Sequence, residues 1–60
     1  MDDYEIDYID GYTMKYNRYS CKANSLGEAV DSLKESQIAD FDNRYLCILK
    51  NGDVVWEESF

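Results

Sequence analysis

The stretch SLGEAVDSLKES, residues 25–36, determines how the rest of the chain can be arranged. Its start has the S-x-x-E pattern of a capping box, with Ser25 as the N-cap and Glu28 as the third helical residue. Apolar residues then recur at helical spacing: Leu26, Ala29, Val30 and Leu33, with Gln37 in the last turn. The pattern predicts one amphipathic helix, to which Ile38 can add a final apolar contact.

Two alternating segments precede this helix. Residues 3–8 and 12–17 each alternate polar and apolar residues around Asp10-Gly11, which is typical of a β-hairpin. We predict a three-residue loop, residues 9–11, with Gly11 in the left-handed conformation. The expected facing pairs are Tyr8 with Tyr12, Ile6 with Met14, Tyr4 with Tyr16 and, on the other face, Glu5 with Lys15. The apolar phase changes after Tyr16, which predicts a bulge near Asn17-Arg18.

The four tyrosines of this hairpin share one face in the predicted register, and they are Tyr4, Tyr8, Tyr12 and Tyr16. We expect this face to pack under the helix. The alternative is a partly exposed aromatic platform, but platforms that stack nucleic-acid bases lie in basic grooves. Residues 1–10 carry five acids and no base, so direct nucleic-acid binding is not expected.

A second hairpin follows the helix. Residues 40–43 are expected to form a loop in which Phe41 plugs the space under the helix. The continuous apolar run of residues 45–49 predicts a strand covered on both faces. Asn51-Gly52 then suits a two-residue type I′ turn. A three-residue loop ending at Gly52 is the alternative, and it would place Leu46, Ile48, Val54 and Trp56 on one face.

The order of elements is therefore ββαββ. This order predicts a single α+β domain over residues 1–60, with an antiparallel-rich four-stranded sheet and one helix packed on one face. The pattern leaves the spatial order of the strands open. A domain of this size buries only about 60% of the surface of its unfolded chain, so it has little room for a deep active-site cleft.

The residue types argue against catalysis. The chain has no histidine and no glycine loop with phosphate-binding spacing, and its two cysteines, Cys21 and Cys47, are too few for a zinc site. The acids of residues 3–7 alternate along a strand, which suits a solvated face better than a calcium site. We therefore predict no enzyme activity, no catalytic residue, no cofactor and no metal.

The cellular compartment is predicted from the lack of targeting and membrane-spanning segments in the sequence. The N-terminal residues lack the basic and apolar regions of a signal peptide, and no run has the length of a membrane span. We therefore expect a cytoplasmic protein in which Cys21 and Cys47 are reduced. A disulfide between them is the alternative.

The net charge of −7 is the strongest functional signal. It disfavours binding to nucleic acid and to anionic membranes, and it favours a basic protein partner. Residues 1–10 sum to −5 and residues 11–22 to +3, so pairing of the first two strands offsets much of the N-terminal charge. The acids left over are the predicted partner-binding residues: Glu28, Asp31, Glu35, Asp40, Asp42, Glu57 and Glu58. The alternative is that these acids form an ordinary solvated surface.

In size, charge and ββαββ layout, the chain resembles the small acidic inhibitor proteins of bacteriophages and mobile elements. These include anti-CRISPR proteins and inhibitors of host polymerases or nucleases, several of which resemble DNA in charge. Residues 19–29, YSCKANSLGEA, are also similar to a strand-to-helix junction of small phage-encoded domains. The resemblance implies a DNA mimic in the host cytoplasm that inhibits a nucleic-acid-handling protein by occupying its basic surface.

A structural or assembly module, such as a homodimer, is the alternative function. Residues 46–49 and 54–56 offer apolar side chains on both faces of the predicted sheet, whereas one helix covers only one face. An apolar face left exposed in this way would mark an interface.

Overall fold

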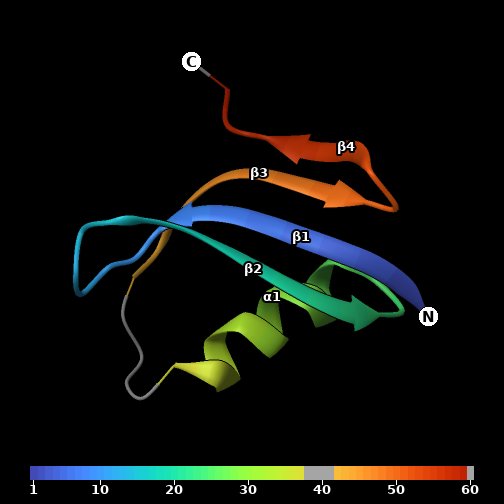
Figure 1. Ribbon diagram of the computed structural model, residues 1–60, viewed down its shortest axis with the longest axis horizontal. Coiled ribbons are helices and arrows are strands. Elements are labelled where there is room, and N and C mark those ends of the chain that lie inside the picture. The colour runs from blue at the N-terminus through green and yellow to red at the C-terminus, as the bar shows by residue number, and fades with distance from the viewer. Residues whose placement is uncertain (38–41, 60) are drawn as a thin grey trace.

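The computed structural model describes residues 1–37 and 42–59. Its elements are β1 (Asp2–Ile9), β2 (Tyr16–Ala23), α1 (Leu26–Ser36), β3 (Arg44–Lys50) and β4 (Asp53–Glu57). The four strands form one sheet in the order β2-β1-β3-β4, and each neighbouring pair is antiparallel. Figure 1 shows α1 beside β2 and β1, and β4 at the opposite side of the molecule. The α+β class and the ββαββ order predicted from the sequence are confirmed.

Helix α1 begins where its capping signal predicts. The hydroxyl of Ser25 accepts a hydrogen bond from the Glu28 N–H at 3.2 Å. The Glu28 carboxylate accepts one from the Asn24 N–H at 2.7 Å, one residue earlier than in the usual capping box. The helix ends at Ser36, with Gln37 as its C-cap. The predicted contact of Ile38 and the predicted plug Phe41 lie outside the described residues.

The core lies between α1 and the β2–β1 half of the sheet. Its buried side chains come from three strands and the helix, and they are Tyr4, Ile6, Tyr8, Ala23, Ala29, Leu33 and Ile48. The Tyr19 hydroxyl lies 2.7 Å from the Ser32 Oγ, which ties β2 to the helix. Among the described residues, α1 makes its strand contacts with β2 and β1. The β3–β4 half of the sheet therefore extends beyond the helix.

The predicted register of the first hairpin is wrong. In the structure Ile6 faces Tyr19, Tyr4 faces Cys21 and Tyr8 faces Asn17. Tyr12, Met14 and Tyr16 are strongly exposed, so only Tyr4 and Tyr8 of the tyrosine face are buried. The predicted bulge near Asn17-Arg18 is also wrong, because β1 and β2 pair without a register shift.

The loop between β1 and β2 is longer than predicted because Asp10 organises it. The Asp10 carboxylate accepts hydrogen bonds from the N–H groups of Tyr12 and Thr13 at 2.8 and 3.0 Å. The Asp10 N–H donates to the Lys15 carbonyl at 2.9 Å, which closes the loop. Met14, rather than Gly11, takes the left-handed conformation, with a φ of 61°. This longer loop allows all eight residues of β1 to pair with residues 16–23.

The second hairpin has the two-residue turn, the first of the two predicted alternatives. Lys50 pairs with Asp53, and Asn51 and Gly52 have φ values of 51° and 88°, as a type I′ turn requires. A register shift between Ile48 and Leu49 sets Trp56 opposite Ile48 and Val54 opposite Leu49. Trp56 and Val54 therefore lie on opposite faces of the sheet.

Strand β3 is central in the sheet but is not covered on both faces as predicted. Only Ile48 is buried, whereas Tyr45, Leu46, Cys47 and Leu49 are half-buried. The two thiols are free, as expected from the sequence. Cys21 faces Tyr4 on the helix side and Cys47 faces Asp7 on the outer side, so the sheet separates them.

Candidate functional site

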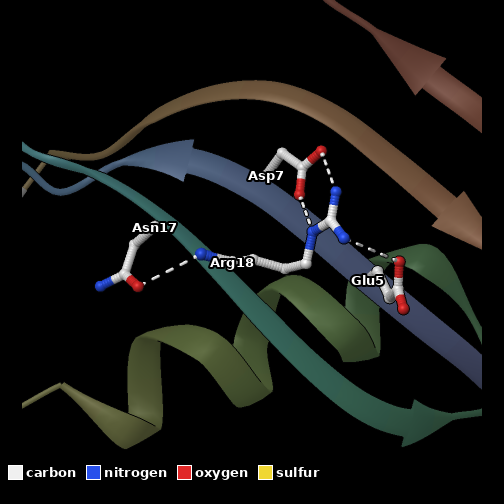
Figure 2. Close-up of polar contacts among 4 residues, drawn as sticks. All are labelled: Glu5, Asp7, Asn17 and Arg18. Atoms are coloured by element: carbon white, nitrogen blue, oxygen red, sulfur yellow. Dashed lines mark hydrogen bonds and ion pairs between the residues drawn. The ribbon is translucent and has the colours of Figure 1, made fainter.

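The outer face of the sheet carries an internally compensated charge cluster. The Arg18 guanidinium contacts the Asp7 carboxylate at 2.7 Å and lies 3.9 Å from the Glu5 carboxylate (Figure 2). These ionic contacts raise the pKa of Arg18, with the hydrogen bond to Asp7 as the largest cause. The sequence predicted Lys15 as the partner of Glu5, which is wrong because the register places Ser20 opposite Glu5. The signal for the observed register was the alternation of Tyr19, Cys21 and Ala23 after the phase change, because these residues face β1 on the helix side.

The start of β1 is compensated in a second way. The Lys50 ammonium lies 3.6 Å from the Asp2 carboxylate. The Asn51 side chain accepts a hydrogen bond from the Asp3 N–H at 3.0 Å and donates one to the Asp2 carboxylate at 3.1 Å. The charge of Asp2 is therefore offset from β3, whereas Arg18 of β2 offsets Glu5 and Asp7.

The predicted acids of α1 share one side of the helix. Glu28, Asp31 and Glu35 are exposed and stand at positions i, i+3 and i+7, opposite the buried Ala29 and Leu33. Within the described part of the chain, none of the three is in an ion pair. We call Glu28, Asp31 and Glu35 the acidic stripe. It spans about 10 Å along the helix axis.

The other predicted acids lie elsewhere. Asp42 is exposed just before β3, and Asp40 lies outside the described residues. Glu57 is exposed at the end of β4. Both carboxylate oxygens of Glu58 accept hydrogen bonds from the Arg44 guanidinium, at 2.9 and 2.5 Å. Because α1 and β4 are at opposite sides of the sheet (Figure 1), the structure does not join Glu57 and Glu58 to the acidic stripe.

The described residues hold no group of three or more cysteine, aspartate or glutamate side chains placed to bind a metal ion. An open depression of about 420 Å³ lies over β1 and β2, and it is lined by Asp3, Tyr4, Glu5, Ser20, Cys21 and Lys22.

No helix in the described ranges has the length and apolar character needed to cross a membrane. Comparison of the chain with known protein families, with curated proteins and with solved structures finds no match.

Acidification is expected to destabilise the fold through three carboxylates. Hydrogen bonds lower the pKa of Asp2 (from Asn51), Asp10 (from Thr13 and Tyr12) and Glu58 (from Arg44). Because the folded-state pKa is below the ordinary value, each group stabilises the fold at higher pH. That contribution is lost as the pH falls below the ordinary values of 3.8 and 4.5. We therefore expect the melting temperature, measured by circular dichroism, to decrease as the pH is lowered below these values.

The variant Asp10→Asn separates this cause from general charge effects. Asparagine keeps an oxygen that can accept the two loop hydrogen bonds, but it does not titrate. The melting temperature of this variant should depend less steeply on pH below 3.8 than that of the wild type. Parallel curves for the two proteins would contradict the role given to Asp10.

Proposed function

We propose that this protein is a non-enzymatic binding module that occupies the basic, nucleic-acid-binding surface of a partner protein. The acidic stripe is the observation that supports this function best. Four acids in or next to the strands pair with Arg18, Lys50 or Arg44 within the fold, and they are Asp2, Glu5, Asp7 and Glu58. The stripe has no such partner among the described residues, so its field is available to a surface outside the molecule.

The physical basis of the proposal is electrostatic complementarity. Charged surfaces of opposite sign speed association and select partners more than they add raw affinity. A nucleic-acid backbone presents regularly spaced negative charges to a basic cleft. A regular row of carboxylates on a helix presents negative charge to the same cleft in a similar way. Because Asp31 and Glu35 are exposed, this attraction should weaken as salt concentration rises.

In its finer form, the proposal is that the protein acts as a DNA mimic and inhibits its partner by competition. Phage-encoded inhibitors of host defence or of host polymerases would act in this way in the host cytoplasm. The support is the net charge of −7 on a small domain together with the placement of the stripe.

The test is affinity capture from a lysate of the source cells with a tagged protein, with and without duplex DNA as competitor. The wild type should capture a basic nucleic-acid-handling protein that duplex DNA displaces. The double variant Asp31→Asn with Glu35→Gln should lower the affinity for that protein by about tenfold at low salt. Glu28 is left intact in this variant because its carboxylate also caps the helix.

The matched control carries the same net charge change at other sites. Thr13→Lys with Ser59→Lys also raises the formal charge by two, and both positions are exposed. This control should bind almost as well as the wild type if the stripe makes the contact. Equal losses in the two double variants would reduce the effect to net charge alone. Capture that is insensitive to both variants and to DNA would refute the proposed function.

A further inference from the structure

Strand β4 is an open edge of the sheet and is apolar at its centre. It is the last strand in the order β2-β1-β3-β4, and among the described residues it is hydrogen-bonded in the sheet to β3 alone. All five of its residues are exposed, including Val54 at 54%, Val55 at 46% and Trp56 at 41%. Helix α1 lies at the far side of the sheet (Figure 1), so it leaves this edge open. Edge strands with exposed backbone groups and apolar side chains are templates for strand pairing.

The register shows which backbone groups of β4 point outward. Asp53 faces Lys50 across the two-residue turn, and the Glu58 N–H donates to the Leu46 carbonyl at 2.9 Å. Both residues therefore direct their hydrogen-bonding groups toward β3. Because the direction alternates along an antiparallel strand, Val54 and Glu57 direct their N–H and C=O groups away from β3. In a regular strand, residues whose backbone groups point outward are two positions apart. Here they are three positions apart, because the bulge adds one residue between Val54 and Glu57.

The charges at the two ends of β4 indicate which kind of strand could pair with this edge. Asp53 and Glu57 are exposed and flank the apolar centre, and neither is in an ion pair among the described residues. If two copies of β4 paired antiparallel about their centres, Asp53 of each copy would meet the acidic end of the other, residues 57–58. Like charges on paired strands are destabilising, and the net charge of −7 on each copy adds to the repulsion. A segment with lysine or arginine at its ends has the complementary pattern.

We infer that β4 binds an extended segment of a partner protein by strand addition, and that this segment has an apolar centre flanked by basic residues. Its backbone pairs with the outward groups of Val54 and Glu57. Its side chains, alternating between the two faces, contact Val54 on the outer face and Trp56 on the helix side. The surface is separate from the acidic stripe, which lies on α1 at the other side of the sheet.

The first test uses the blocked peptide Lys-Arg-Val-Thr-Ile-Val-Lys-Lys and the whole protein. Nuclear magnetic resonance titration should shift the amide signals of Val54 and Glu57, and calorimetry should give the affinity. The same peptide with glutamate in place of every lysine and arginine should bind at least about tenfold more weakly. N-methylation of alternate amides in the basic peptide should abolish binding, because it removes the donors needed for strand pairing. Amide shifts confined to α1, or equal binding of the basic and acidic peptides, would overturn the inference.

The second test changes β4 itself. Val54→Pro removes an outward N–H while leaving the bonds to β3 in place, because proline is tolerated at such edge positions. It should weaken peptide binding by about tenfold, whereas the control Val54→Thr should change it by less than about twofold. A Val54→Pro protein that melts like the wild type and binds the peptide equally well would overturn strand addition.

A charge exchange tests the same surface without proline. Asp53→Lys with Glu57→Lys should reverse the preference, so that the protein binds the acidic peptide better than the basic one. Unchanged preference would overturn the inference. Sedimentation tests the competing occupant, a second copy of the chain. A wild-type dimer that Val54→Pro converts to the 7.0 kDa monomer would assign β4 to self-association and overturn the peptide proposal.

Discussion

Replacing Leu33 by alanine is expected to cost about 2–5 kcal/mol of unfolding free energy. Leu33 is fully buried, with no exposed surface, and it lies on the face of α1 that packs against β2 and β1. The cost combines the lost apolar burial with the cavity left behind. A chain of 60 residues has only about 3–9 kcal/mol of total stability, so this variant should be close to unfolding at room temperature.

Urea unfolding followed by circular dichroism measures this cost. Lys34→Ala is the matched control, because Lys34 is the next residue of α1 but is exposed, and alanine is a good helix former. It should change the unfolding free energy by less than about 0.5 kcal/mol. Similar losses for the two variants would mean that α1 is not anchored through Leu33.

The second large effect is expected at Ile6, which is also fully buried. Ile6 lies on the central strand β1, between Tyr19 of β2 and Ile48 of β3. Ile6→Ala should therefore cost about 2–5 kcal/mol. Met14→Ala should cost less than about 0.5 kcal/mol, because Met14 lies in the loop and is 74% exposed.

The same pair of variants distinguishes the two hairpin registers. In the register predicted from the sequence, Ile6 and Met14 face each other and both would lose buried surface on truncation. In the observed register only Ile6 does. Comparable destabilisation by the two variants, measured by urea unfolding, would favour the shorter loop, in which Met14 faces Ile6, over the longer loop, in which Ile6 faces Tyr19.

The candidate surface was predictable in part. The acidic stripe could be identified from the sequence, because the spacing of Glu28, Asp31 and Glu35 sets them on one side of any helix that buries Leu33. Glu58 could not be distinguished from Glu57 in this way. Its pairing with Arg44 depends on β3 and β4 lying side by side. The open edge at β4 was also beyond the sequence, since strand order decides which strands lack a neighbour.

Local signals in the sequence determined the elements and one turn. The capping interaction of Ser25 with Glu28, and the left-handed pair Asn51-Gly52, satisfy backbone groups within a few residues of each other. Their energies depend little on the rest of the fold. These signals were sufficient for the ββαββ order, for the start of the helix and for a type I′ turn as one of two alternatives.

Only the tertiary structure decided the hairpin register, the strand order and the balance of charges. Both short and long loops satisfy the alternation around Asp10, and the long one prevails because it sets Tyr19 and Cys21 beside β1 on the helix side. Strand β3 pairs with β1, and the Asn51 N–H donates to the Asp3 carbonyl at 2.7 Å, although the two residues are 48 positions apart in the sequence. Contacts between residues so far apart in sequence depend on the packing of the complete sheet against α1, which periodicity along the chain does not specify.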